Sequence, residues 1–229
     1  MYRFTSALFL LGLGLLIAAI FQQMALPGAA PIVGQAINEA AAQQTGAANF
    51  VTAVVLGYRG FDTLMELTIL FTAATAGGLV LGKSRTTTRH DPEAGFILRA
   101  GADLFFPLLL VVGLYIILHG HLTPGGGFQG GVILAVAFFL PLLAKPGTAI
   151  SHTAVSVIEG LAGASFILIG LVAMLADQAF LTPLLDKGQL GTLLSAGTLP
   201  LLYIAVGLKV GSELAGLLAH LAETEASDT

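Results

Sequence analysis

The sequence contains no cysteine and no tryptophan, and only 10% of its 229 residues are charged. Without cysteine there is no disulfide, no thiolate nucleophile and no cysteine-ligated iron–sulfur or zinc site. The net charge of -4 is spread thinly, so it indicates neither a nucleic-acid partner nor a polybasic lipid anchor. Walker A, Rossmann, nucleophile-elbow and HExxH motifs are also missing. We therefore expect no cofactor and no enzymatic activity from this chain alone, and any redox chemistry belongs to a partner.

Apolar residues make up 56% of the chain and recur in runs of about 20, the length that crosses a bilayer as a helix. The sequence therefore predicts an all-α, polytopic protein of the inner (plasma) membrane. Hydropathy and length predict six spans, at about residues 4–24, 62–81, 97–118, 126–143, 153–176 and 191–221. The last run is too long for one straight span and contains Pro200, so we expect a short helix and a break before the true span.

The basic residues predict the orientation of the spans. Most of them lie on one side of the predicted topology: Arg3, Lys83, Arg85, Arg89, Arg99 and Lys145. The positive-inside rule places this side in the cytoplasm. Both termini are then cytoplasmic, and the junction between the third and fourth spans, residues 119–131, is on the outer side.

Ionisable side chains inside apolar runs are unusual, because each costs about 2.5–3.5 kcal/mol to insert near the bilayer centre. Such residues tend to mark an ion path or a buried pair. Six residues are candidates for an ion path: Asp62, Glu66, Asp103, Glu159, Lys209 and Glu213.

Two of these carboxylates also have a local structural explanation. Arg59 precedes Asp62 by three residues at a membrane boundary, where pairing and snorkelling are ordinary. Arg99 precedes Asp103 by one helical turn, so a local pair is the favoured interpretation there as well.

The other four candidates lie deeper in the apolar runs. Glu66 is one turn further into its span than the preceding aspartate. Glu159 is followed by Gly160, which indicates close helix contact, and it either pairs across that contact or serves a proton relay. Lys209 and Glu213 are four residues apart, so they either neutralise each other or set the charge of a path.

The junction between the third and fourth spans, "HGHLTPGGGFQGG", is more particular than a loop requires. His119 and His121 make a poor metal site, because they are two residues apart with no cysteine or carboxylate nearby. We interpret them as part of an interfacial polar junction or as titrating groups at the mouth of a path. Gln129 belongs to the same junction.

The junction also contains three consecutive glycines: Gly125, Gly126 and Gly127. They remove every side chain where the chain re-enters the membrane. Two interpretations are open, namely close packing against neighbouring backbone and an exposed helix N-terminus that attracts an ion. For Gly207 and Gly211, a GxxxG pair, close packing is the favoured interpretation.

Two stretches carry a family resemblance. The segment "HGHLTPGGGFQGGVILA" closely resembles the signature of the MnhB family, the B-type subunits of the multisubunit Mrp-type Na+/H+ antiporters, where serine is more usual at Thr123. The resemblance continues through residues 193–218 and covers about residues 98–220. Upstream, "YRGFDTLMELTILFTAA" resembles the E-type subunit of membrane-bound hydrogenases and the end of the large antiporter subunit, with Met65 where glycine is usual.

The resemblance implies a fusion of two pieces. The predicted organisation is a membrane segment resembling the E-type hydrogenase subunit at residues 1–84, a cytoplasmic linker at 85–97, an MnhB-like domain at 98–221 and an acidic tail at 222–229.

The resemblance also implies a function. It implies an integral subunit that works beside other membrane subunits of an antiporter complex and contributes to a Na+ or H+ path. Two alternatives stay open: an ion-translocating subunit of a redox-driven complex such as a membrane-bound hydrogenase, and a scaffold without an ion path.

Overall fold

The computed structural model describes residues 2–23, 32–82, 94–145, 148, 150–175 and 177–228. Lys83, Arg85 and Arg89, which carried much of the orientation prediction, lie outside these residues. The chain divides into two compact units, residues 1–39 and residues 40–229, and each is described by itself.

Every regular element in the described ranges is a helix. In chain order they are α1 (Tyr2–Gln23), α2 (Ile32–Thr45), α3 (Phe50–Thr52), the π-helix η1 (Ala53–Tyr58), α4 (Gly60–Leu81), α5 (Phe96–Leu118), α6 (Gly127–Ala144), α7 (His152–Leu175) and α8 (Leu199–Asp228). Six of them are long and apolar enough to cross a membrane, namely α1, α4, α5, α6, α7 and α8. The predicted all-α architecture with six spans is confirmed.

The expected break in the last span is wrong. Helix α8 begins at Leu199 and runs as one helix of 30 residues, so Pro200 lies in its first turn. A proline is tolerated there because the first N–H groups of a helix have no carbonyl partner within the helix. The described residues before it, 177–198, form turns and bends rather than a short helix.

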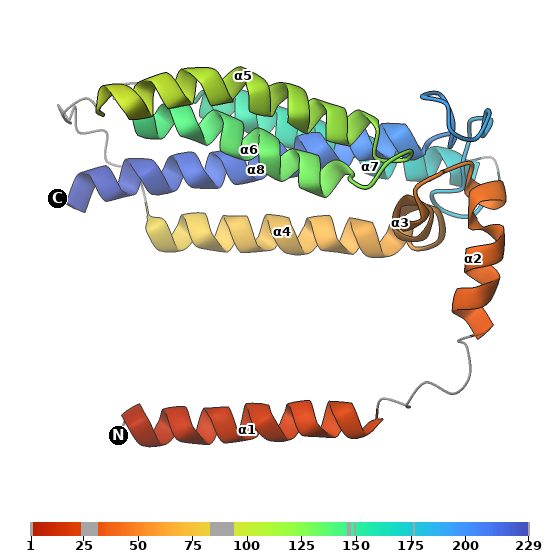
Figure 1. Ribbon diagram of the computed structural model, residues 1–229, viewed down its shortest axis with the longest axis horizontal. Coiled ribbons are helices and arrows are strands. Elements are labelled where there is room, and N and C mark those ends of the chain that lie inside the picture. The colour runs from red at the N-terminus through yellow and green to blue at the C-terminus, as the bar shows by residue number, and fades with distance from the viewer. Residues whose placement is uncertain are drawn as a thin grey trace. The chain divides into compact units, whose positions relative to one another are not determined.

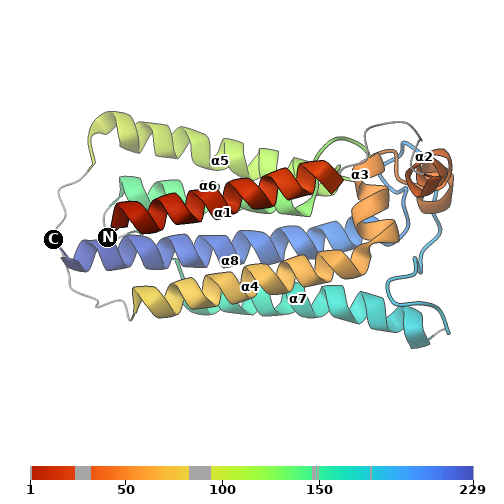
Figure 2. The same cartoon turned by 90° about the horizontal axis from the view of Figure 1, so that it is seen from below.

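Helix α8 is the centre of the second unit. It contacts α4, α5, α6 and α7, and α5 packs in turn on α6. Figure 1 and Figure 2 show these five helices running lengthwise beside one another, with α8 among them. In its membrane-spanning window 56% of the residues are buried, compared with 6% for α4, so the core forms around α8. Its buried side chains include Leu202, Val206 and Val210.

Small residues let α5, α6 and α8 approach closely. A Cβ atom added at Gly130 would overlap Ile117 Cγ1, and one added at Gly207 would overlap Ile117 Cδ1. A Cβ atom at Gly211 would lie 3.2 Å from the carbonyl oxygen of Gly131. Between membrane helices, van der Waals contact of this kind stabilises association. The packing interpretation of the GxxxG pair is therefore confirmed.

Candidate functional site

A buried ion-pair cluster joins α7 and α8. Lys209 Nζ lies 2.8 Å from Glu159 Oε1 of α7 and 2.9 Å from Glu213 Oε2, one turn along α8. The Lys209 ammonium also lies 4.7 Å from the centre of the Phe71 ring of α4. The side chains of Lys209, Glu159 and Glu213 are 10%, 21% and 3% exposed, so water screens these charges only weakly.

Local sequence explains how this cluster forms. Residues four apart share a helix face, which brings Glu213 to Lys209. A Cβ atom at Gly163 would already lie 3.6 Å from Lys209 Cε, so the small residue makes room for the lysine stem. Nothing lies within 4 Å of a Cβ atom at Gly160, so this glycine is not a contact point.

The cluster carries more negative than positive charge. Two carboxylates share one ammonium, which leaves one negative charge when all three groups are ionised. Glu213 Oε1 is buried and makes no hydrogen bond within the described part of the chain. A buried carboxylate oxygen without a partner is costly, so it favours a proton, a water molecule or a cation at that position.

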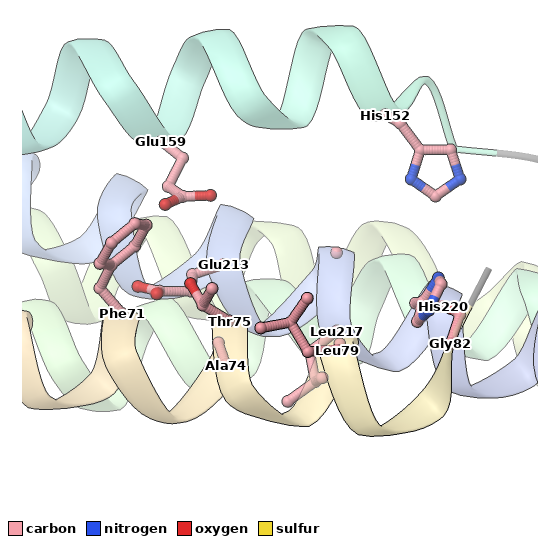
Figure 3. Close-up of a pocket in the computed structure, with 12 residues that line it drawn as sticks. Phe71, Ala74, Thr75, Leu79, Gly82, His152, Glu159, Glu213, Leu217 and His220 are labelled. Atoms are coloured by element: carbon pink, nitrogen blue, oxygen red, sulfur yellow. Dashed lines mark hydrogen bonds between the residues drawn. The ribbon is translucent and has the colours of Figure 1, made fainter. Parts of the chain in front are cut away.

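A groove leads to this cluster between α4, α7 and α8. Its volume is about 820 Å³, and it is lined by Phe71, Ala74, Thr75, Gly78, Leu79, Gly82, His152, Glu159, Glu213, Gly216, Leu217 and His220. Figure 3 shows Glu159 and Glu213 at one end of the groove and His152 and His220 at the other. Among the described residues, no group of three or more His, Asp or Glu side chains is arranged to hold a metal ion.

The opposite end of the bundle is held by polar contacts to the glycine-rich junction. Asn49 Nδ2 donates to the carbonyl oxygens of Gly120 and Thr123, at 2.7 and 2.9 Å. Thr52 Oγ1 donates to the Gly120 carbonyl at 2.6 Å and lies 2.8 Å from the Tyr203 hydroxyl. Because the threonine proton is used on Gly120, the Tyr203 hydroxyl donates to Thr52. This network ties the segment before α4 to the junction and to α8.

The Tyr203 side chain packs against the glycines of the junction. A Cβ atom at Gly126 would lie 2.7 Å from the Tyr203 ring, and one at Gly127 would lie 2.6 Å from Val206 Cβ. Gly125 and Gly126 have φ values of 151° and 148°, a conformation that other residues rarely adopt. These contacts support close packing as the reason for the glycines.

The two histidines of the junction differ in environment. His119 stacks on the Tyr115 ring at 4.1 Å, whereas His121 is fully buried and neither ring nitrogen forms a hydrogen bond to the described residues. Burial lowers the pKa of His121 from its usual value of 6.5, and the charge of His119 acts in the same direction. The backbone of Thr192 and Leu193 opposes this shift.

A second, smaller cavity lies beside the junction. Its volume is about 90 Å³, and its lining includes Glu66 of α4, Gln129 of α6 and Tyr203 of α8. Glu66 and Gln129 are both exposed on the surface of this unit. An exposed carboxylate in a membrane-spanning helix is unfavourable against lipid, so this surface is suited to a polar neighbour.

The two remaining carboxylates form exposed ion pairs. Asp62 Oδ2 lies 2.6 Å from Arg59 Nε, as the local-pair interpretation expects. Asp103 pairs with Lys145 at the end of α6, a partner that spacing did not suggest. Exposed ion pairs of this kind contribute about 0–1 kcal/mol to stability.

The structure brings together three of the six ion-path candidates: Glu159, Lys209 and Glu213. It also identifies residues that sequence reasoning missed: Asn49, Thr52 and Tyr203. Local sequence does not indicate their contacts with the junction, because these partners are at least 68 residues away. Asn49 also has a local role, because it caps α3 by accepting from the Val51 N–H at 3.0 Å.

Residues 97–216 of this chain match a family described as a domain related to the MnhB subunit of the Na+/H+ antiporter. The Methanocaldococcus jannaschii protein MJ1307 is 32% identical over 196 residues, which cover 74% of this chain and 74% of that protein.

Two solved structures are similar to this chain along nearly its whole length. A chain of the membrane-bound sulfane sulfur reductase, an archaeal respiratory membrane complex, is 37% identical with a TM-score of 0.81, over 96% of this chain and 97% of that one. A chain of the Mrp complex from Dietzia sp. DQ12-45-1b is 26% identical with a TM-score of 0.78, over 99% of this chain and 26% of that longer one.

Proposed function

We propose a role for this chain from the premise that it belongs to the family of domains related to the MnhB subunit of Na+/H+ antiporters. It is a multi-pass subunit of a cation/proton antiporter complex in the plasma membrane, a transporter component rather than an enzyme, with other membrane subunits as its partners. Within that complex, the Glu159–Lys209–Glu213 cluster is a station on the ion route.

The observation that carries this proposal is the imbalance of charge in the cluster. Lys209 is shared between Glu159 and Glu213, and one oxygen of Glu213 is buried without a partner among the described residues. A proton and a monovalent cation compete for a carboxylate of this kind. When either one arrives at Glu213, the attraction between Glu213 and Lys209 weakens and the ammonium is freed to pair with Glu159 alone.

The energies involved match the available driving force. Moving one charge across 100 mV is worth about 2.3 kcal/mol, close to the cost of about 2.5–3.5 kcal/mol for an ionised side chain in the bilayer. The free energy that a membrane potential supplies is therefore similar to the free energy needed to change which carboxylate of the cluster is ionised.

Glu66 is proposed as a second station, at a contact with a neighbouring subunit. It is exposed beside Gln129, on the rim of the small cavity next to Tyr203. The other two candidates, Asp62 and Asp103, are proposed to have structural roles, because each forms an exposed ion pair.

The test compares charge-neutralising variants in the intact complex. We expect Glu213→Gln to reduce the Na+-driven proton flux into membrane vesicles at least tenfold per assembled complex. Asp103→Asn is the matched control, since it neutralises an exposed carboxylate and should leave the flux unchanged. If Glu213→Gln altered only the amount of assembled complex and not the flux per complex, the chain would be a scaffold.

A redox-driven host is the second candidate, and the structural comparison gives it specific support. The similar reductase chain matches this one over 97% of its length, whereas the similar Mrp chain is about four times longer. Purification of the native complex through this subunit, followed by mass spectrometry, separates the two. Antiporter-like chains alone indicate a dedicated exchanger, and co-purifying metal-cluster proteins indicate a redox-driven pump.

A further inference from the structure

The groove between α4, α7 and α8 has His152 and His220 at one end and the carboxylates of the ion-pair cluster at the other. We propose that it is a water-filled vestibule that brings hydrated monovalent cations or protons to Glu159 and Glu213 from the face where α4 ends, α7 begins and α8 ends. This inference rests on the proposed function for the role of the cluster, but the vestibule itself is tested without measuring transport.

The residue spacings along α7 and α8 give the same depth for the groove. His152 is the first residue of α7 and Glu159 follows seven residues later, a rise of about 10 Å along the helix. His220 and Glu213 of α8 are also seven residues apart, which again corresponds to about 10 Å. Both histidines and both carboxylates line the same groove, so it leads from the face of the membrane to the charged cluster.

The third wall is one face of α4, on which small residues alternate with Phe71 and Leu79. The lining positions of α4 recur at intervals of three or four residues, which places them on one helix face: Phe71, Ala74, Thr75, Gly78, Leu79 and Gly82. A Cβ atom at Gly78 would meet nothing within 4 Å. Side chains therefore leave this space unfilled, and its 820 Å³ is room for roughly 20–30 water molecules.

The two ends of the groove are polar, whereas the residues between them, such as Ala74, Leu79 and Leu217, are apolar. Ionisable groups stand at both ends of the groove, with histidines at the mouth and carboxylates at the base. The excess negative charge at the base attracts cations and repels anions. At the base, the Phe71 ring covers the Lys209 ammonium and ends the groove.

The absence of cysteine from this chain makes the proposal directly testable. In the intact complex, Thr75→Cys places a thiol on the groove wall, and Ile158→Cys places one on α7 at an exposed position that does not line the groove. Thr148→Cys, at an exposed residue before α7, reports which membrane face a reagent reaches. Each variant is treated in sealed vesicles of either orientation with a membrane-impermeant cationic methanethiosulfonate, and the mass of this subunit is then measured.

We expect the cationic reagent to modify Thr75→Cys only in the vesicle orientation in which it modifies Thr148→Cys. Ile158→Cys should react at least tenfold more slowly, because it lies at a similar depth, six residues from its helix end as Thr75 is, but outside the groove. An anionic methanethiosulfonate should react with Thr75→Cys at least tenfold more slowly than the cationic one, and Glu213→Gln should reduce that preference.

Two results would overturn the vestibule. Modification of Thr75→Cys from the opposite face contradicts the direction of access. Reaction with a lipid-soluble maleimide but with neither charged reagent means that lipid or a partner helix fills the groove. Normal labelling together with normal ion exchange by Glu213→Gln would leave the vestibule intact and refute the proposed ion station instead.

Discussion

Replacement of Lys209 by methionine tests the central feature of the site. Methionine keeps an unbranched side chain of similar length but removes the cation that pairs with both Glu159 and Glu213 in the cluster. At an effective dielectric constant of about 20, two unit charges about 4 Å apart interact by about 4 kcal/mol. Removing one partner of a buried ion pair typically destabilises a protein by about 3–5 kcal/mol, because the other charge remains buried.

The variant Lys209→Met should therefore lower the stability of the subunit by about 3–5 kcal/mol. For a chain of this size, each kcal/mol shifts the melting temperature by about 2–4 °C, so the expected decrease is on the order of 10 °C. The assay is thermal denaturation of the purified complex at pH 7, with retention of this subunit in the complex as the signal. Na+-driven proton flux is measured on the same preparations below the melting temperature.

A double-mutant cycle separates lost pairing from lost packing. Glu213→Gln removes the most buried carboxylate, so combining it with Lys209→Met should recover at least about 1 kcal/mol relative to the sum of the single effects. Phe71→Leu controls for the contact between the ammonium and the aromatic ring, which is worth about 2 kcal/mol when the cation is desolvated, as Lys209 is. Additive effects of the two charge changes, or a Lys209→Met complex as stable as wild type, would refute the ion-pair reasoning.

Three further predictions concern packing, the polar junction and pH. Gly130→Ala should cost about 1–3 kcal/mol by overpacking, whereas Gly160→Ala has open space and should be neutral or slightly stabilising, as melting temperatures of the complex would show. Thr52→Val should cost about 1–3 kcal/mol, because the buried Tyr203 hydroxyl loses its acceptor; combining it with Tyr203→Phe should recover part of this loss. The lowered pKa of His121 means that the unfolded state binds its proton more readily, so stability is full above pH 6.5 and decreases as the pH falls below it. His121→Gln should weaken that decrease in melting curves recorded between about pH 7 and pH 5.

Much of the fold follows from composition and length. Six apolar runs predict six spans because a bilayer admits helices whose backbone groups are satisfied internally. The family resemblance at residues 119–131 also comes directly from the sequence, as does the pairing of Lys209 with Glu213, which requires only one turn of helix. One prediction that failed, a break at Pro200, came from judging a long apolar run by its length without locating its first turn.

Spacing did not determine which charges meet across helices. Glu159 is 50 residues from Lys209, and Asp103 is 42 residues from Lys145. Several arrangements of the same apolar helices would separate these residues. Their pairing depends on which helix faces are flat enough for close approach, a property of the packed bundle.

The sequence by itself determined that this is a membrane protein with charged residues in its spans. A helix in lipid requires a long apolar run, so an ionisable residue within such a run can be recognised from the sequence. Only the tertiary structure decided that three of those residues form one cluster at the base of a groove, while two others lie in exposed pairs. The physical reason is that the free-energy cost of a charged residue depends on its depth within an apolar run, which the sequence shows. Its ion-pair partner depends instead on contacts between helices that are distant in the chain.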